Sequence, residues 1–196
     1  MFVKKKINYV LIISAIAVAI YYYIIHGCNN TSELLSYIGL IPLLCLIKII
    51  RKIFKLEISD NLENIYIIFV ILSFLLGSLM KFYHKIYWFD SFTHFVSGIL
   101  TAMVVFIYLK KTKNYDNKTI FYNILFIIAF VMMIASLWEI IEFSIDKIFG
   151  LDTQRVIANG VDDTMKDMIC ALLGSVVFFF LNKFMWVQKL IEKYEV

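Results

Sequence analysis

Long apolar segments alternate with short polar connections along the chain. Crossing the roughly 30 Å hydrocarbon core of a bilayer takes about 20 helical residues. We therefore expect spanning helices over residues 7–25, 34–50, 65–82, 91–109, 119–148 and 163–187. Apolar positions within each segment are continuous, whereas a barrel strand would alternate. The predicted fold is all-α: a polytopic membrane protein whose six helices form one transmembrane bundle in a single domain, 1–196.

The composition supports this class. Hydrophobic residues make up 62% of the 196 residues and charged residues 17%, and the mean hydropathy is +0.83. A soluble domain has about 45–50% apolar and about 25% charged residues. Because Cys28, Cys45 and Cys170 lack paired spacing, we predict neither a disulfide framework nor a zinc motif.

The first apolar segment has a second interpretation, because Lys4, Lys5 and Lys6 precede it. A basic stretch followed by apolar residues is typical of a secretory signal peptide. This segment is longer than the roughly 7–15 apolar residues of a signal core, and no small-x-small cleavage site follows it. We expect an uncleaved helix.

The basic residues indicate the orientation of the bundle. Fourteen of the 19 Lys and Arg residues fall on one predicted side, and nine of the 15 acidic residues fall on the other. Cytoplasmic connections carry the excess of Lys and Arg, so we expect both termini in the cytoplasm. The isoelectric point of about 8.8 then reflects topology, and nucleic-acid binding is not predicted.

Ionisable residues gather at the predicted outer ends of the last three helices. Asp90 and His94 lie one turn apart at the start of the fourth helix. Small residues continue two of the polar faces, Gly98 beyond His94 and Gly174 beyond Asp167, and such residues mark close helix approach. The cluster should therefore face the interior of the bundle, where ionisable groups indicate function. Its other members are Glu139, Glu142, Asp146, Asp162 and Asp163.

Simpler explanations remain open for several of these residues. Asp90 and Asp163 suit helix N-caps, where an acid accepts hydrogen bonds from the first N–H groups of a helix. The glutamates of the fifth helix suit a solvated helix end at the interface. Neither explanation accounts for His94 or Asp167, which lie one turn inside their helices.

Carboxylates grouped with one imidazole suit a divalent metal ion. Crowded anions need compensation by protons, by a cationic side chain such as Lys166 or by a bound cation. Oxygen ligands favour Mg, Mn or Ca, and Zn is less favoured because the cluster contains one histidine. Glu142 or His94 is the expected general base toward a metal-bound water. The predicted metal ligands are Asp90, His94, Glu139, Asp163 and Asp167.

The segments FDSFTHFVSG, LWEIIEF and DDTMKDMICALLGS resemble the YjdF-type multi-pass membrane proteins of bacteria and, more remotely, the VanZ-like proteins. The resemblance covers residues 87–175 and implies a location in the bacterial cytoplasmic membrane. Glu142 and Asp167 stand where the VanZ-like pattern has amides. The matching positions are Asp90, His94, Glu139, Glu142, Asp163, Asp167 and Gly174.

The leading hypothesis is a metal-dependent hydrolase or transferase that acts on a lipid or lipid-linked phosphate at the outer leaflet. A polar cluster at headgroup depth meets phosphates, while apolar walls hold the chains. Two alternatives stay open, namely an ion-coupled transporter or channel, whose acids would bind the coupling ion, and a membrane scaffold or assembly protein. Membrane lipids are the expected partners, and the sequence predicts no particular protein partner.

Overall fold

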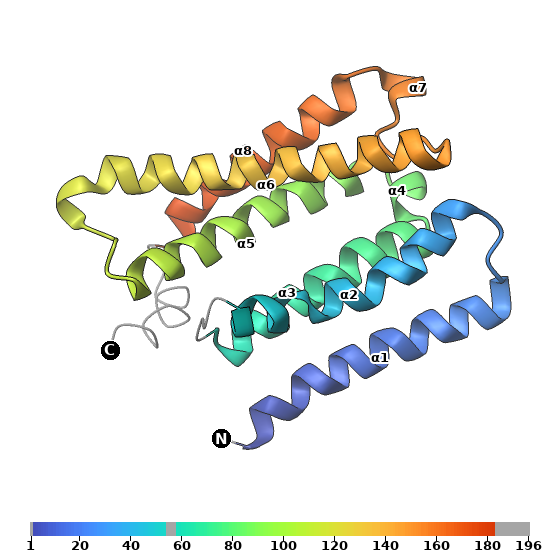
Figure 1. The fold of residues 1–196 in the computed structure, drawn as a ribbon, viewed down its shortest axis with the longest axis horizontal. Helices are drawn as coiled ribbons and strands as arrows, with labels where there is room; N and C mark the ends of the chain where they lie inside the picture. Colours follow the sequence, from blue (N-terminus) through green and yellow to red (C-terminus); the bar gives the residue numbers. More distant parts are fainter. Residues whose placement is uncertain (1, 54–57, 183–196) are drawn as a thin grey trace. The chain divides into compact units, whose positions relative to one another are not determined.

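The computed structural model describes residues 2–53 and 58–182, and no β-strand occurs among them. Six helical segments in this part are long and apolar enough to span a membrane (Figure 1), which confirms the all-α, six-helix prediction. Three shorter elements, α4 (Phe82–Lys85), η2 (Asn117–Thr119) and α7 (Val156–Asn159), lie in connections. The spanning segments are α1 (Phe2–His26), α2 (Thr31–Ile53), α3 with η1 (Asp60–Val70 and Ile71–Leu79), α5 (Phe89–Lys111), α6 (Ile120–Phe149) and α8 (Asp162–Leu181).

The chain divides into two compact units, residues 1–89 and 90–196, and each is described by itself. The single domain and the cytoplasmic termini stay predictions. The end of the helix predicted over 163–187 lies outside the described residues, as do four lysines that contribute to the predicted orientation: Lys55, Lys183, Lys189 and Lys193.

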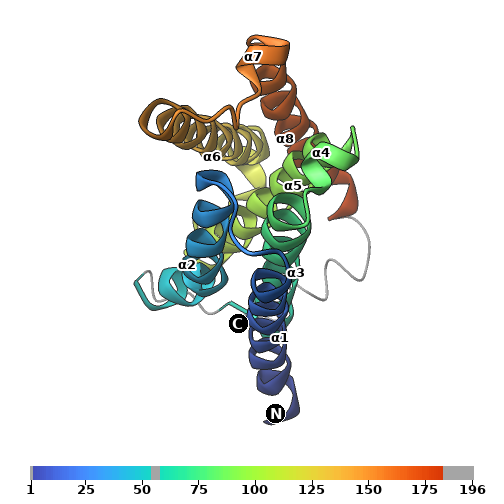
Figure 2. The same ribbon diagram turned by 90° about the vertical axis from the view of Figure 1, so that its right-hand side faces the viewer.

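The first unit packs three spanning segments around one apolar core. Helix α1 lies along α3, and α2 lies along α3 and η1 (Figures 1 and 2). Their inward faces bury aliphatic side chains and alanines. The packing of these side chains supplies the free energy of helix association in this unit. The buried members of the core are Ala15, Ala19, Leu40, Leu44, Ile67, Val70, Leu75 and Leu79.

Two buried glutamates in the first unit are paired with cationic side chains. Glu63 is 3% exposed, and its carboxylate lies 3.8 Å from Lys48 Nζ and 3.4 Å from Arg51 Nη1 on α2. Glu33 at the start of α2 lies 2.9 Å from Lys81 Nζ. The hydrogen bond to Glu33 raises the pKa of Lys81 above its ordinary value. Both pairs neutralise acidic side chains that are buried near helix ends.

The third spanning segment differs from the single helix predicted over 65–82. It begins earlier, at Asp60, and its second half is the π-helix η1. The Ser73 hydroxyl donates a hydrogen bond to the Phe69 carbonyl oxygen at 2.9 Å, which competes with α-helical bonding in this turn. Lys81 then takes a left-handed conformation with φ of 63°, which a helix of L-residues does not continue.

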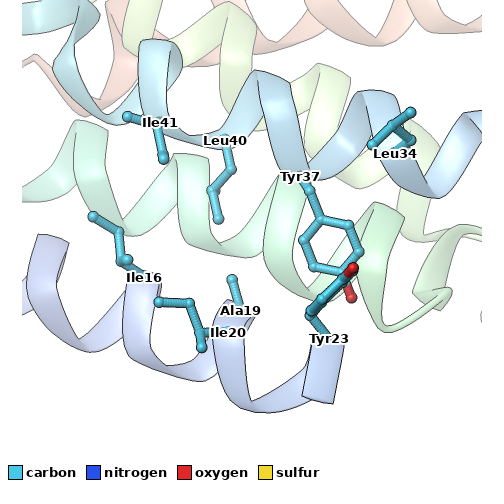
Figure 3. A pocket seen from close by; sticks show the side chains of 8 residues that line it. All are labelled: Ile16, Ala19, Ile20, Tyr23, Leu34, Tyr37, Leu40 and Ile41. Carbon is cyan, nitrogen blue, oxygen red and sulfur yellow. The ribbon is translucent and has the colours of Figure 1, made fainter. Parts of the chain in front are cut away.

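An apolar groove of about 250 Å³ lies between α1 and α2 of the first unit (Figure 3). At one end of this groove the rings of Tyr23 and Tyr37 meet edge to face, with their centres 5.5 Å apart. The remaining lining residues are Ile16, Ala19, Ile20, Leu34, Leu40 and Ile41.

The second unit depends on a close approach of α5 to α8. A methyl group added at Gly98 would overlap the carbonyl oxygen of Ala171, and one added at Gly174 would overlap that of Phe95. Both glycines are buried, so their small size allows the two backbones to meet. Helix α6 also packs on α8. These contacts hold together the helix ends that carry the predicted site residues.

Replacing Gly174 with alanine should lower the free energy of unfolding by about 1–3 kcal/mol, because the added methyl group forces two backbones apart. The measurement is the temperature at which half of the detergent-purified protein stays monodisperse. Gly39→Ala is the matched control, since its added methyl group would come no closer than 3.4 Å to the Phe74 ring. Equal thermal stability of the two variants would contradict the close approach.

Candidate metal centre

The predicted site residues come from one end of three helices in the second unit. They lie at the start of α5, in the last turns of α6 and at the start of α8, and residues 150–161 join α6 to α8 (Figure 1). Helix α6 ends because Gly150 takes a left-handed conformation with φ of 66°, which turns the chain back toward α8. We define the acid cluster as Asp90, His94, Glu139, Glu142, Asp163 and Asp167.

Three members of the acid cluster offer ligand atoms to one point. His94 Nε2 lies 3.6 Å from Asp90 Oδ1 and 3.8 Å from Asp167 Oδ2, and one ligand atom from each of the three residues lies within 4.8 Å of the others. Ligands held at about 2.1 Å from one metal ion are about 3.0–3.4 Å apart. Small side-chain rotations would therefore bring this triad, Asp90, His94 and Asp167, to coordination distance.

Two carboxylate oxygens of the acid cluster are buried without a hydrogen-bond partner in the described part of the chain, Asp167 Oδ1 and Glu139 Oε1. Asp167 is 4% exposed and Glu139 is 6% exposed. An unsatisfied buried polar group costs about 1–3 kcal/mol, and a charged one costs more. A cation that bound both Asp167 oxygens, Oδ1 and the Oδ2 that lies 3.8 Å from His94 Nε2, would satisfy this carboxylate, so the donor set fits a metal ion.

Asp163 is paired with cationic side chains and is not part of the triad. Its Oδ1 lies 3.2 Å from Lys166 Nζ, and its Oδ2 lies 3.8 Å from Arg155 Nη1. Arg155 Nη1 also lies 3.3 Å from Asp90 Oδ2. The guanidinium thus bridges the start of α5 and the start of α8. Asp163 lies outside the triad and two cations neutralise its carboxylate, so its role as a metal ligand stays a prediction.

Side-chain hydrogen bonds fix the loop that carries Arg155. Asp146 accepts hydrogen bonds from the Thr153 N–H and hydroxyl, each at 2.7 Å, and from the Gln154 N–H at 3.1 Å. The Gln154 amide in turn donates to Glu139 Oε2 at 3.1 Å. Asp146 lies on the same helical face as the members of the acid cluster on α6. Because its carboxylate accepts these hydrogen bonds, Asp146 holds the loop in place and is not part of the triad.

Glu142 lies beside the triad in a different environment. Its Oε1 accepts a hydrogen bond from the Trp138 indole N–H at 2.9 Å, one turn earlier on α6. Electrostatic interactions link it to Glu139, Asp90 and Asp167. The indole N–H therefore fixes the orientation of the Glu142 carboxylate.

Sequence reasoning missed Arg155 and Gln154, because both lie in a connection between predicted helices. One signal was present: Arg155 is one of only two arginines in a chain that contains 17 lysines. Arginine is the preferred cation for buried ion pairs, since its planar group donates several hydrogen bonds at once. A lone arginine between acidic helix ends therefore indicates a bridging role.

Comparison with known proteins identifies the family. Residues 7–187 match the family described as "Predicted membrane protein (DUF2238)". The chain belongs to this family. An uncharacterized protein of Thermotoga maritima is 34% identical over 128 residues, which cover 63% of this chain and 62% of that protein. No solved structure matches the chain. Family membership and the six apolar helices together identify the chain as a predicted integral membrane protein.

Replacing Asp146 with alanine should release the loop, because three hydrogen bonds to one carboxylate are lost. A hydrogen bond to a charged group contributes about 1.5–3 kcal/mol. The net loss of even one such bond therefore raises the equilibrium constant for local opening of the loop roughly tenfold or more. Trypsin should then cleave after Arg155 at least about tenfold faster, as followed by mass spectrometry.

The control for this experiment is Asp162→Asn, which changes an exposed acid at the start of α8. Cleavage at the wild-type rate in Asp146→Ala would show that the loop does not depend on Asp146.

Proposed function

We propose that this protein binds a divalent metal ion at Asp90, His94 and Asp167 and uses it to hydrolyse or transfer the phosphate of a lipid or lipid-linked substrate. The observation that carries the proposal is the triad, in which three ligand atoms from two membrane-spanning helices lie within 4.8 Å. Its independent support is the buried Asp167 Oδ1, which has no hydrogen-bond partner in the described residues.

The donor set favours Mg, Mn or Ca. Two carboxylates and one imidazole form a mainly oxygen environment that hard cations prefer. Zn is less favoured, because its sites use more histidine or cysteine. Glu139 is the expected supporting acid, since its electrostatic interaction reaches His94 and its Oε1 is buried without a hydrogen-bond partner in the described chain.

The geometry favours Glu142 over His94 as the general base. His94 Nε2 is the atom that faces Asp90 and Asp167, and a nitrogen that binds a metal has no lone pair left to accept a proton. The Glu142 carboxylate is held by Trp138 and keeps one oxygen to accept a proton from a metal-bound water.

Two features support a phosphate as the reacting group. Arg155 and Lys166 place two cationic side chains at the edge of the acid cluster, and a metal ion combined with such cations stabilises the charge of a transferred phosphoryl group. The cluster also lies at the ends of spanning helices, the depth at which headgroups meet a membrane protein. With the predicted orientation, these ends face the outer leaflet.

An ion-coupled transporter is the second candidate, because acids outnumber cations in the cluster. A transporter needs a polar path toward the other side of the membrane. In the described parts of α6 and α8, two buried polar side chains beyond the acid cluster form hydrogen bonds to nearby backbone carbonyl groups and do not extend such a path. Asn123 donates to the Asp116 carbonyl oxygen at 2.8 Å, and Ser175 donates to that of Leu172 at 2.6 Å. This local bonding supports the enzyme over the transporter.

Purified wild-type protein, dialysed after loading with Mn²⁺, should retain about one metal ion per chain by elemental analysis. Asp167→Asn should retain at least tenfold less at the same free Mn²⁺ concentration, since it loses a charged ligand. Vesicles that contain phosphatidic acid or farnesyl pyrophosphate should release inorganic phosphate in the presence of wild-type protein and Mn²⁺.

Asp162→Asn serves again as the control, because it removes the same charge near the start of α8 without altering the triad. Wild-type protein that retains no divalent ion would contradict the proposed metal centre. Retained metal without phosphate release from either kind of vesicle would contradict the phosphate chemistry alone, and Mn²⁺ flux into vesicles would then favour the transporter.

A further inference from the structure

Arg155 contacts the same carboxylate that the triad uses. Asp90 divides its two oxygens, with Oδ1 at 3.6 Å from His94 Nε2 and Oδ2 at 3.3 Å from Arg155 Nη1. The Arg155 side chain is 22% exposed and the Asp90 side chain 15% exposed. This contact is therefore largely shielded from water, and the guanidinium neutralises one of the proposed metal ligands.

A divalent ion bound at the triad would weaken the contact between Asp90 and Arg155. An ion within coordination distance of Asp90 Oδ1 lies only a few ångströms from the guanidinium on Oδ2. Two positive charges at that separation repel each other strongly where the effective dielectric constant is low. Asp90 would also be neutralised by the metal, which removes much of its attraction for Arg155.

The backbone of Arg155 is in a conformation that its contacts must maintain. Its φ is 53°, in the left-handed region, which is strained for a residue with a side chain. The Arg155 N–H donates to the Asp152 carbonyl oxygen at 3.2 Å. Loss of the pair with Asp90 would remove one of the interactions that offset this strain, so the loop would open more readily.

Asp163 can lose Arg155 without becoming unpaired. Lys166 Nζ lies 3.2 Å from Asp163 Oδ1, one turn along α8, whereas Arg155 Nη1 is 3.8 Å from Oδ2. Release of the guanidinium therefore leaves Asp163 with a cation, and Asp90 with the metal. The charges of both helix ends stay compensated in either arrangement.

From these contacts we infer that Arg155 is a built-in competitor of the metal ion and sets the affinity of the centre for cations. Resting on the proposed metal site, this inference concerns the regulation of that site. The guanidinium occupies Asp90 until a cation of higher charge displaces it. A monovalent ion brings no more charge than the arginine that it would replace, so the pair selects divalent over monovalent cations.

The test is a Mn²⁺ titration of full-length protein in detergent, followed by the loss of the free-ion EPR signal. Arg155→Gln should tighten the dissociation constant by about tenfold, because one positive charge next to the ion is removed. Arg155→Lys should stay within about threefold of wild type. The matched control is Lys147→Gln, which removes an equal charge from an exposed position at the end of α6, where the ammonium lies 5.5 Å from the Phe143 ring.

Equal or weaker binding by Arg155→Gln, with wild-type protein that binds Mn²⁺, would overturn this inference and leave the metal centre standing. If neither protein binds Mn²⁺, the proposed centre fails and the inference fails with it. Binding by Arg155→Gln alone would also overturn the inference, because the ion would then fail to displace the guanidinium in the wild-type protein.

A second measurement uses wild-type protein and does not depend on the folding of a variant. Saturating Mn²⁺ should increase trypsin cleavage after Arg155, because the displaced side chain frees the loop. Cleavage after Lys147 is the internal reference, and a decrease of the Arg155 cut relative to it would contradict displacement.

Discussion

Burial of carboxylates at the ends of apolar helices is the constraint on which the second unit depends. Taking an anion out of water costs several kcal/mol unless another group compensates for the lost hydration. Each acid at this end of the unit meets the requirement differently. Asp163 has two cations, Asp146 has three hydrogen bonds from the loop, and Glu142 has an indole N–H. Asp167 keeps a buried oxygen without such a partner in the described chain.

The close approach of α5 and α8 makes this constraint unavoidable. Gly98 and Gly174 let the two backbones touch, so the side chains one turn away are forced into the same small space. Separating the helices by one methyl group would relieve the crowding of Asp90, His94 and Asp167, but it would also lose the packing. The glycines and the acids are therefore parts of one arrangement: tight packing creates the crowding that a cation would relieve.

The sequence predicted the helices, and it placed Asp90, His94 and Asp167 among five expected metal ligands, for definite physical reasons. Continuous apolar runs have no alternative to helices in lipid, and the spacing of Asp90 and His94 places both on one face of α5. Asp167 followed from the topology, since it lies one turn inside the helix that starts at the same membrane side. What the sequence did not predict depends on tertiary contacts. The bridge between Asp90 and Asp163 requires Arg155, whose position depends on a left-handed backbone and on a loop that Asp146 holds by hydrogen bonds. The π-helix η1 likewise has no periodicity signal within an evenly apolar segment.

The most direct test of the metal centre is pulsed EPR of the protein with bound Mn²⁺, because this measurement detects a nitrogen that coordinates the ion. We expect a hyperfine coupling from one imidazole nitrogen in the wild type and in His84→Gln, whose side chain belongs to α4. The coupling should vanish in a folded His94→Gln variant. A coupling that persists in His94→Gln, or bound Mn²⁺ with no nitrogen coupling in the wild type, would contradict a centre built on Asp90, His94 and Asp167.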